Sequence, residues 1–222
     1  MKKKKNLLLI QPHSDDILFS ASHFLFNKKK YGDIKILTVE SNFDRLEEDL
    51  DICNHFGVKL ERLVSEIHSE NFHKEYYSLH KHMDDESALE FCQNKIGKKK
   101  LKELKKELTK VITKHKSKGY KIVTCLGVGH PFHWLVRTLT EDLSDLFYRD
   151  FPHSYKRRNQ PYINAIVGTQ FNLKFLSNPK KRHDEKFDLI KKYYKSQSSL
   201  LFFEKRYIDK ILAEEFYEKI ED

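Results

Sequence analysis

The 222-residue sequence has no hydrophobic run of the length that a transmembrane helix needs. Its longest apolar runs, 7–10 and 200–203, hold four residues each, whereas a helix that spans a bilayer takes roughly 20. Lysines precede the first run as they do in a signal peptide, but the run breaks at Gln11 and no small-residue cleavage site follows. We therefore expect no membrane span, and we interpret the first run as part of a strand.

Glycine, proline and cysteine are also scarce. Seven glycines and five prolines exclude collagen-like and low-complexity architectures. The three cysteines show no C-x-x-C spacing, which indicates neither a disulfide framework nor a zinc finger and favours a reducing, cytoplasmic location. No repeat or Gly/Ser linker divides the chain, so we expect a single domain over 1–222 with a sizeable core.

Short apolar strands alternate with longer amphipathic helices along the chain. We predict strands over 6–11, 35–41, 60–67, 120–128 and 162–170, and helices over 15–29, 44–56, 98–118, 131–147, 180–195 and 204–220. This order indicates βαβ units and therefore an α/β fold: a single Rossmann-like domain with a mostly parallel sheet flanked by helices and the active site at the C-terminal ends of the strands. Residues 68–97 lack clear periodicity and are interpreted as a lid or loop-rich insertion.

Two polar clusters follow strands of this predicted sheet. His13, Asp15 and Asp16 follow the first strand, and His130 and His133 follow the fourth. Together they contain the two histidines and one carboxylate of a catalytic zinc site whose fourth ligand is water. Adjacent Asp15 and Asp16 point in different directions, so we expect one to bind metal and the other to act as a base. Helix capping by the first cluster and two ordinary helix-start histidines in the second are the alternative.

These clusters belong to longer motifs. Segment 12–18 reads PHSDDIL, and segment 129–133 reads GHPFH. They resemble the PHPDDE and GHPDH motifs of the PIG-L/LmbE-like family of zinc-dependent N-deacetylases. Weaker matches follow in the order of the family and extend the resemblance over nearly the whole chain: Arg45-x-x-Glu48 with Phe56-Gly57-Val58, Tyr148-x-Asp150-x-Pro152, Tyr194-x-Ser196-Gln197 and Glu215-Phe216.

The resemblance implies a set of roles for the clustered residues. His13, Asp16 and His133 would bind one zinc ion per chain, Asp15 would be the general base, and His130 would face the oxyanion. The implied reaction removes an acetyl or other acyl group from the amide nitrogen of an N-acetyl amino sugar or a glycoconjugate precursor. The ligand chemistry would also admit Fe²⁺, Co²⁺ or Mn²⁺.

Three positions depart from the family motifs. Ser14 replaces a proline, Ile17 replaces a glutamate, and Phe132 replaces an aspartate whose carboxylate could orient an imidazole. The implied ligands and base are all retained, which favours an active enzyme. A catalytically impaired relative that binds sugar without hydrolysis is the alternative function.

Candidate substrate-binding residues are Arg45, Tyr148 and Asp150. Arg45 would contact a sugar or phosphate, with a surface pair to Glu48 as the alternative, and the other two would brace the crevice or the substrate. The histidines and tyrosines of 73–82 could stack on a sugar as part of a lid; the alternative is a set of solvent-exposed side chains.

The formal net charge of +9 raises the possibility of a nucleic-acid-binding module. The lysine runs at 2–5, 28–30 and 98–100 are scattered, however, and no RRM, KH or zinc-finger pattern accompanies them. We therefore expect a small-molecule or glycolipid substrate and no nucleic-acid partner, and we interpret the lysines as solvated surface.

Overall fold

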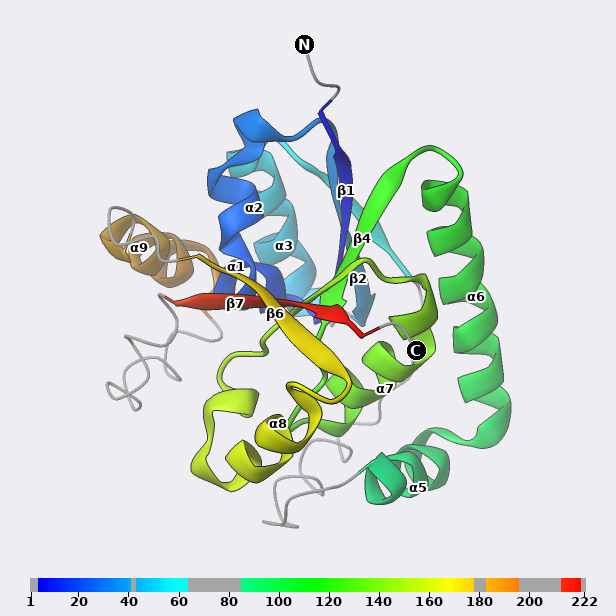
Figure 1. Ribbon diagram of the computed structural model, residues 1–222. Coiled ribbons are helices and arrows are strands. Elements are labelled where there is room, and N and C mark those ends of the chain that lie inside the picture. Colours follow the sequence, from blue (N-terminus) through cyan, green and yellow to red (C-terminus); the bar gives the residue numbers. More distant parts are fainter. Residues whose placement is uncertain (1–3, 41–42, 64–84, 178–182, 196–212, 221–222) are drawn as a thin grey trace.

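The structure is a computed structural model that describes residues 4–40, 43–63, 85–177, 183–195 and 213–220. In chain order, its elements are β1 (Asn6–His13), α1 (Asp16–Ser20), α2 (Ser22–Phe26), η1 (Lys28–Lys30), β2 (Ile34–Glu40), α3 (Phe43–Phe56), β3 (Lys59–Arg62), α5 (Asp85–Ile96), α6 (Lys98–Lys116), β4 (Tyr120–Cys125), α7 (Pro131–Thr140), η2 (Glu141–Leu143), β5 (Leu146–Tyr148), η3 (His153–Tyr155), η4 (Arg157–Asn159), α8 (Gln160–Ile166), β6 (Phe171–Ser177), α9 (His183–Tyr193) and β7 (Glu214–Lys219) (Figure 1).

The described strands form one mixed sheet of seven strands in the order β3-β2-β1-β4-β5-β7-β6. β1 pairs in parallel with β2 on one edge and with β4 on the other, and β5 continues the parallel part beside β4. Only β7, among these strands, runs antiparallel to its neighbours β5 and β6. The predicted α/β fold with a mostly parallel sheet is confirmed.

Helices cover both faces of the sheet (Figure 1). α1, α2, α3 and α9 lie on one side, and α5, α6 and α7 lie on the other. Leu8, Leu9 and Ile10 of β1 have 0% exposure, as expected for a strand that is covered on both faces. Within the described ranges, no helix is long and apolar enough to cross a membrane.

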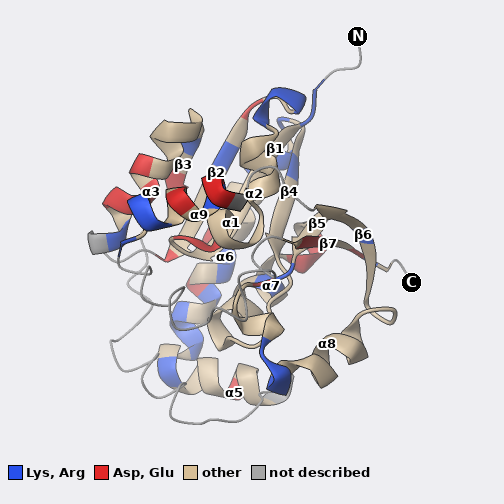
Figure 2. Cartoon of the chain, turned by 90° about the vertical axis from the view of Figure 1, so that its left-hand side faces the viewer, with Lys and Arg blue, Asp and Glu red and all other residues tan. Residues whose placement is uncertain are grey.

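Acidic residues gather on α3 (Figure 2), whereas lysines are frequent on α6. Leu104, Leu108 and Ile112 of α6 are buried, and the lysines between them, Lys105, Lys106 and Lys110, are exposed. This arrangement agrees with a solvated helix face.

The first half of the chain follows the prediction closely. The strands predicted from residues 6, 35, 60 and 120 correspond to β1, β2, β3 and β4, and the helices predicted over 44–56 and 98–118 correspond to α3 and α6. The predicted helix over 180–195 corresponds to α9. Residues 64–67, at the end of the third predicted strand, lie outside the described residues.

Part of the predicted insertion over 68–97 is helical. Residues 68–84 lie outside the described part of the chain, but α5 forms from residue 85 onward. Its Ala88, Cys92 and Ile96 are buried at intervals of four, which is a helical period that we did not identify in the sequence. The Cys92 thiol lies 3.6 Å from the carbonyl oxygen of Pro131, so α5 packs at the start of α7.

Two predictions between residues 131 and 170 were wrong. The helix predicted over 131–147 ends at Thr140, because the residues of β5 pair with both β4 and β7 instead. The strand predicted over 162–170 is largely the helix α8, which has a proline in its first turn and buries Ile163 and Ile166 at helical spacing.

The C-terminal helix predicted over 204–220 was also wrong. Residues 204–212 lie outside the described residues, and the segment that follows is the strand β7. β7 lies between β5 and β6, where Phe216 and Tyr217 are buried. The strand conformation of β7 is set by its pairing with a strand on each side, and the local propensity of its residues gives no information about these neighbours.

The helix predicted over 15–29 is divided at Ala21 into α1 and α2. Two N–H groups at the break donate to the carboxylate of Glu214, from Ser22 at 3.0 Å and from the next residue at 2.8 Å. The ammonium of Lys186 lies 2.6 Å from the same carboxylate, and both charged side chains are almost fully buried. This buried pair joins α2, α9 and β7.

We expect Lys186→Met to lower the free energy of unfolding by about 3–5 kcal/mol, because it leaves the Glu214 carboxylate buried without its cation. Lys174→Met is the matched control, since Lys174 pairs with Glu218 while both side chains are about half exposed, and it should cost less than about 1 kcal/mol. Urea unfolding monitored by circular dichroism compares the two variants. If both variants lost the same free energy of unfolding, the buried pair would stabilise the fold no more than the exposed pair does, contrary to our expectation.

Candidate active site

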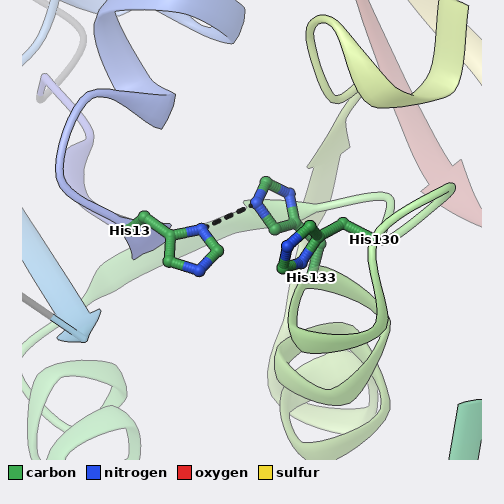
Figure 3. A group of neighbouring side chains, drawn as sticks. All are labelled: His13, His130 and His133. Carbon is green, nitrogen blue, oxygen red and sulfur yellow. Dashed lines mark hydrogen bonds between the residues drawn. The ribbon is translucent and has the colours of Figure 1, made fainter. Parts of the chain in front are cut away.

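The two polar clusters meet at one edge of the sheet. β1 ends at His13, and the loop after β4 leads into α7 at Pro131. Since β1 and β4 are adjacent and parallel, both loops leave the sheet at the same edge. Nδ1 of His13 lies 3.0 Å from Nε2 of His133, although 120 residues separate them in the chain (Figure 3).

Asp16 completes a compact set of three potential metal ligands. Its Oδ2 lies 3.7 Å from Nδ1 of His13 and 3.5 Å from Nε2 of His133. A tetrahedral ion with bonds of about 2.0–2.2 Å holds its ligand atoms about 3.3–3.6 Å apart. With the 3.0 Å between the two imidazole nitrogens, the three spacings lie within about 0.3 Å of these values, so the residues predicted as ligands are compatible with a divalent transition metal such as zinc in donor chemistry and approximately in spacing.

His130 lies beside this set. Nitrogens of His13, His130 and His133 lie within 4.8 Å of one another, and the His130 ring centroid is 5.0 Å from that of His133 (Figure 3). His130 caps α7, however, and its Nδ1 accepts a hydrogen bond from the N–H of Phe132 at 3.2 Å. An accepting Nδ1 leaves the proton of a neutral ring on Nε2. His130 is thus arranged as a hydrogen-bond donor rather than as a third imidazole ligand.

Asp15 has a backbone conformation that residues other than glycine rarely adopt, with φ of +100°. Such strain persists only where surrounding structure holds it, and it is enriched at functional sites. Oδ2 of Asp15 lies 3.8 Å from Nη1 of Arg45, whose side chain is 28% exposed. Burial raises the pKa of Asp15 well above its usual range, and the positive charge of Arg45 opposes this rise.

The carboxylate and imidazole of the ligand set influence each other's charge. Burial raises the pKa of Asp16 from 3.8 to about 6, and the charge of His133 opposes the rise. Burial alone would lower the pKa of His133, but the carboxylates of Asp16 and Asp150 raise it above its ordinary value. Protons and a metal ion would therefore compete for the same atoms.

A buried carboxylate, Asp49 of α3, holds the turn that carries the first cluster. It accepts hydrogen bonds from Gln11 at 3.0 Å, from Thr38 at 2.9 Å and from the Tyr194 hydroxyl at 2.8 Å. The side-chain oxygen of Gln11 in turn accepts the N–H of Ile17 at 3.1 Å. The network ties α1 to both neighbouring strands and to the residue after α9. We did not predict Asp49 or Gln11 from the sequence.

Tyr148 and Asp150, predicted as substrate-binding residues, lie beneath the site with 0% exposure. The Tyr148 hydroxyl donates to the carbonyl of Ile10 at 3.1 Å, and Oδ1 of Asp150 lies 2.7 Å from Nδ1 of His133. Neither side chain is accessible to a substrate. Both therefore hold the site in place from beneath and do not make the direct contact with the substrate that we had predicted. Partly exposed Arg45 is the one of the three that a substrate can reach.

Two further residues at the site were missed. Glu40 ends β2, and its Oε2 lies 3.5 Å from Nε2 of His13. The ring centroid of His153 lies 4.9 Å from that of His130 and 5.1 Å from that of His133. The strand-end rule could have found Glu40, since β2 ends at the same edge as β1. No comparable signal identifies His153.

Two of the three departures from the family motifs, Phe132 and Ile17, are apolar and buried. Phe132 has 0% exposure, and its ring centroid lies 5.2 Å from that of His13. Ile17 is 1% exposed in the core. Aromatic packing against the His13 ring therefore occupies the position where the motif has a carboxylate.

Comparisons with known proteins match the fold. The structure resembles the N,N'-diacetylchitobiose deacetylase from Pyrococcus horikoshii, solved with its inhibitor MPG, with a TM-score of 0.58 and 12% sequence identity over 99% of this chain and 85% of that chain. The conserved protein TT1542 from Thermus thermophilus aligns with a TM-score of 0.46 and 13% identity over 95% of this chain and 92% of that chain. No protein-family model and no curated protein matches the sequence.

The raised pKa of Asp16 predicts how stability changes with pH in the metal-free protein. Between the unfolded value of 3.8 and the folded value of about 6, the folded state binds more protons, so stability falls as pH rises. Asp16→Asn removes this dependence. As pH rises from about 4 to about 6, we expect the free energy of unfolding of the variant to increase by on the order of 2 kcal/mol relative to that of the wild type.

Chemical denaturation of chelator-treated protein at several pH values measures this difference. Asp142→Asn is the control, because that side chain is 86% exposed. If the free energies of unfolding of the wild type and Asp16→Asn differed by the same amount at every pH, the expectation would be contradicted.

Proposed function

We propose that this chain is a metal-dependent hydrolase that removes an acetyl or other acyl group from the amide nitrogen of an N-acetyl amino sugar or a glycoconjugate precursor. The observation that carries the proposal is the convergence of His13, Asp16 and His133 on one point, with Asp15 and His130 beside them. The motif resemblance and the fold shared with a diacetylchitobiose deacetylase support it.

In this proposal, His13, Asp16 and His133 hold the metal. A bound zinc ion supplies a Lewis acid for the amide carbonyl and lowers the pKa of a water ligand to about 7. The two nitrogens and one oxygen leave the open position that a catalytic site needs.

Asp15 would act as the general base. It adjoins the ligand Asp16 in the chain, its backbone is strained, and its Oδ2 lies 3.8 Å from Nη1 of Arg45. The guanidinium of Arg45 favours the ionised carboxylate that a base requires. Asp15 then takes a proton from the attacking water and returns it to the departing nitrogen as the carbon–nitrogen bond breaks, so that acetate and a free amine are formed.

His130 would stabilise the negative charge that develops on the carbonyl oxygen. Because its Nδ1 accepts the N–H of Phe132, its Nε2 carries the proton that can be donated. A donor fixed at a helix start needs no reorganisation during the reaction, and removal of one such donor typically costs about 10²–10³ in kcat.

The substrate class rests on the motif resemblance and on the partly exposed Arg45, which would contact a hydroxyl or phosphate of the substrate. We extend the proposal to a single domain over 1–222 in which 68–97 includes a lid. A reducing, cytoplasmic location is supported by three free, buried cysteines.

We expect the purified protein to bind about one zinc ion per chain, since three ligands leave one position for water. The protein is exposed to zinc, the excess is removed, and elemental analysis measures the number of zinc ions per chain. The variant His133→Ala should lose the bound zinc. A ratio near zero for the wild type would remove the metal site from the account.

Asp15→Asn should keep the metal but lower kcat/KM by about 10²–10⁴, because the base is removed while the ligand set stays. Release of free amine is measured across N-acetylglucosamine, diacetylchitobiose and their lipid- or nucleotide-linked forms. Asp51→Asn, an exposed change on α3, is the control and should retain full activity.

Unchanged amine release by Asp15→Asn would show that another group is the base. If the wild type bound zinc and sugars but released no amine from any compound of the panel, the chain would be a sugar-binding relative without hydrolysis.

A further inference from the structure

Each imidazole of the proposed ligand set has a carboxylate at the nitrogen that faces away from the set. His133 directs Nε2 at the set, and its Nδ1 lies 2.7 Å from Oδ1 of Asp150. His13 directs Nδ1 at the set, and its Nε2 lies 3.5 Å from Oε2 of Glu40. The two rings therefore use opposite nitrogens, and each has an acceptor behind it.

We propose that Asp150 and Glu40 are positioning residues that fix the tautomers of the two imidazoles for metal binding. An imidazole binds a metal only through a nitrogen that carries no proton, so the proton must be on the other nitrogen. A carboxylate at that other nitrogen holds the proton there and makes the ring a better ligand. This proposal rests on the proposed function, because it assumes a metal at the ligand set.

Asp150 is rigidly placed for this role. It is fully buried, and its second oxygen, Oδ2, accepts the backbone N–H groups of Gly127 at 2.8 Å and Val128 at 3.3 Å. These donors belong to the loop between β4 and α7 that carries His130. One carboxylate thus sets the loop and the His133 ring together.

Glu40 provides a looser support for His13. It comes from the C-terminal end of β2, the strand beside β1, and is 7% exposed. The distance of 3.5 Å is that of an ion pair rather than of a short hydrogen bond. We therefore expect a smaller contribution to metal affinity from Glu40 than from Asp150.

An amide at position 150 should reverse the tautomer of His133. The two backbone N–H groups at Oδ2 require an acceptor, so the oxygen of Asp150→Asn would take that place and its NH₂ would face Nδ1 of His133. Nδ1 would then have to accept, which places the ring proton on Nε2, the nitrogen proposed to bind the metal. The Asn side chain has the same shape as that of Asp, so Asp150→Asn changes only where the ring proton of His133 is held.

The test measures zinc affinity by competition with a chromophoric chelator, which does not depend on enzymatic activity. Asp150→Asn should weaken zinc binding about 10–100-fold, Glu40→Leu about tenfold, and Glu40→Gln, which keeps an acceptor oxygen, less than about threefold. Glu61→Gln is the matched control: Glu61 contacts His115 at 2.9 Å, a carboxylate–histidine pair outside the ligand set, and the variant should bind zinc as the wild type does.

Nitrogen-15 spectra of the histidine rings provide a second measurement, taken on metal-free protein at alkaline pH. The wild type should have the His133 proton on Nδ1, so that its Nε2 accepts the hydrogen bond from Nδ1 of His13 at 3.0 Å, and Asp150→Asn should move the His133 proton to Nε2. A wild-type His133 that carries its proton on Nε2 would overturn the proposal without any variant, even if Asp150→Asn failed to fold.

The two proposals fail in different ways. If the wild type did not bind zinc, the proposed function would fall and this proposal with it. If the wild type bound zinc while Asp150→Asn and Glu40→Leu bound it equally tightly, only the positioning role would be wrong.

Discussion

The parallel pairing of β1 with β4 is the constraint on which the candidate site depends. Their register, with Leu9 opposite Val123, brings the two strands to a common edge. There, one loop leads to Asp16 at the start of α1 and the other leads to His133 in the first turn of α7. Hydrophobic burial on both faces of β1 fixes this pairing, because a shift of register would move buried side chains out of the layers that cover them. Core packing thereby determines how far apart the potential ligand atoms lie.

Burial is also the source of the electrostatics at the site. Taking a carboxylate out of water disfavours its charge, so each buried acid needs donors or cations nearby. Glu214 has Lys186 and backbone N–H groups, and Asp150 has backbone N–H groups and His133. Asp16 faces two imidazoles, and burial raises its pKa to about 6. A divalent cation would satisfy the charge of Asp16 where protons otherwise compete.

Much of the parallel half of the sheet could be predicted from sequence, because its strands and helices have distinct apolar periods. The strand β7 could not, since it is defined by two neighbouring strands rather than by its own residues. At the site, strand ends followed by His and Asp gave the ligand candidates. Asp49 was missed because a buried acid within a helix has no local signature, whereas Glu40 could have been found from its place at the end of β2. The bracing role of Asp150 appears only once the fold brings it to His133.

The most direct measurement is a crystal structure of the zinc-loaded protein with an anomalous difference map at the zinc edge. The account predicts one peak within bonding distance of His13 Nδ1, Asp16 Oδ2 and His133 Nε2, with Nε2 of His130 outside the coordination sphere. A peak bonded to three imidazoles including His130, or a peak away from this edge of the sheet, would contradict it.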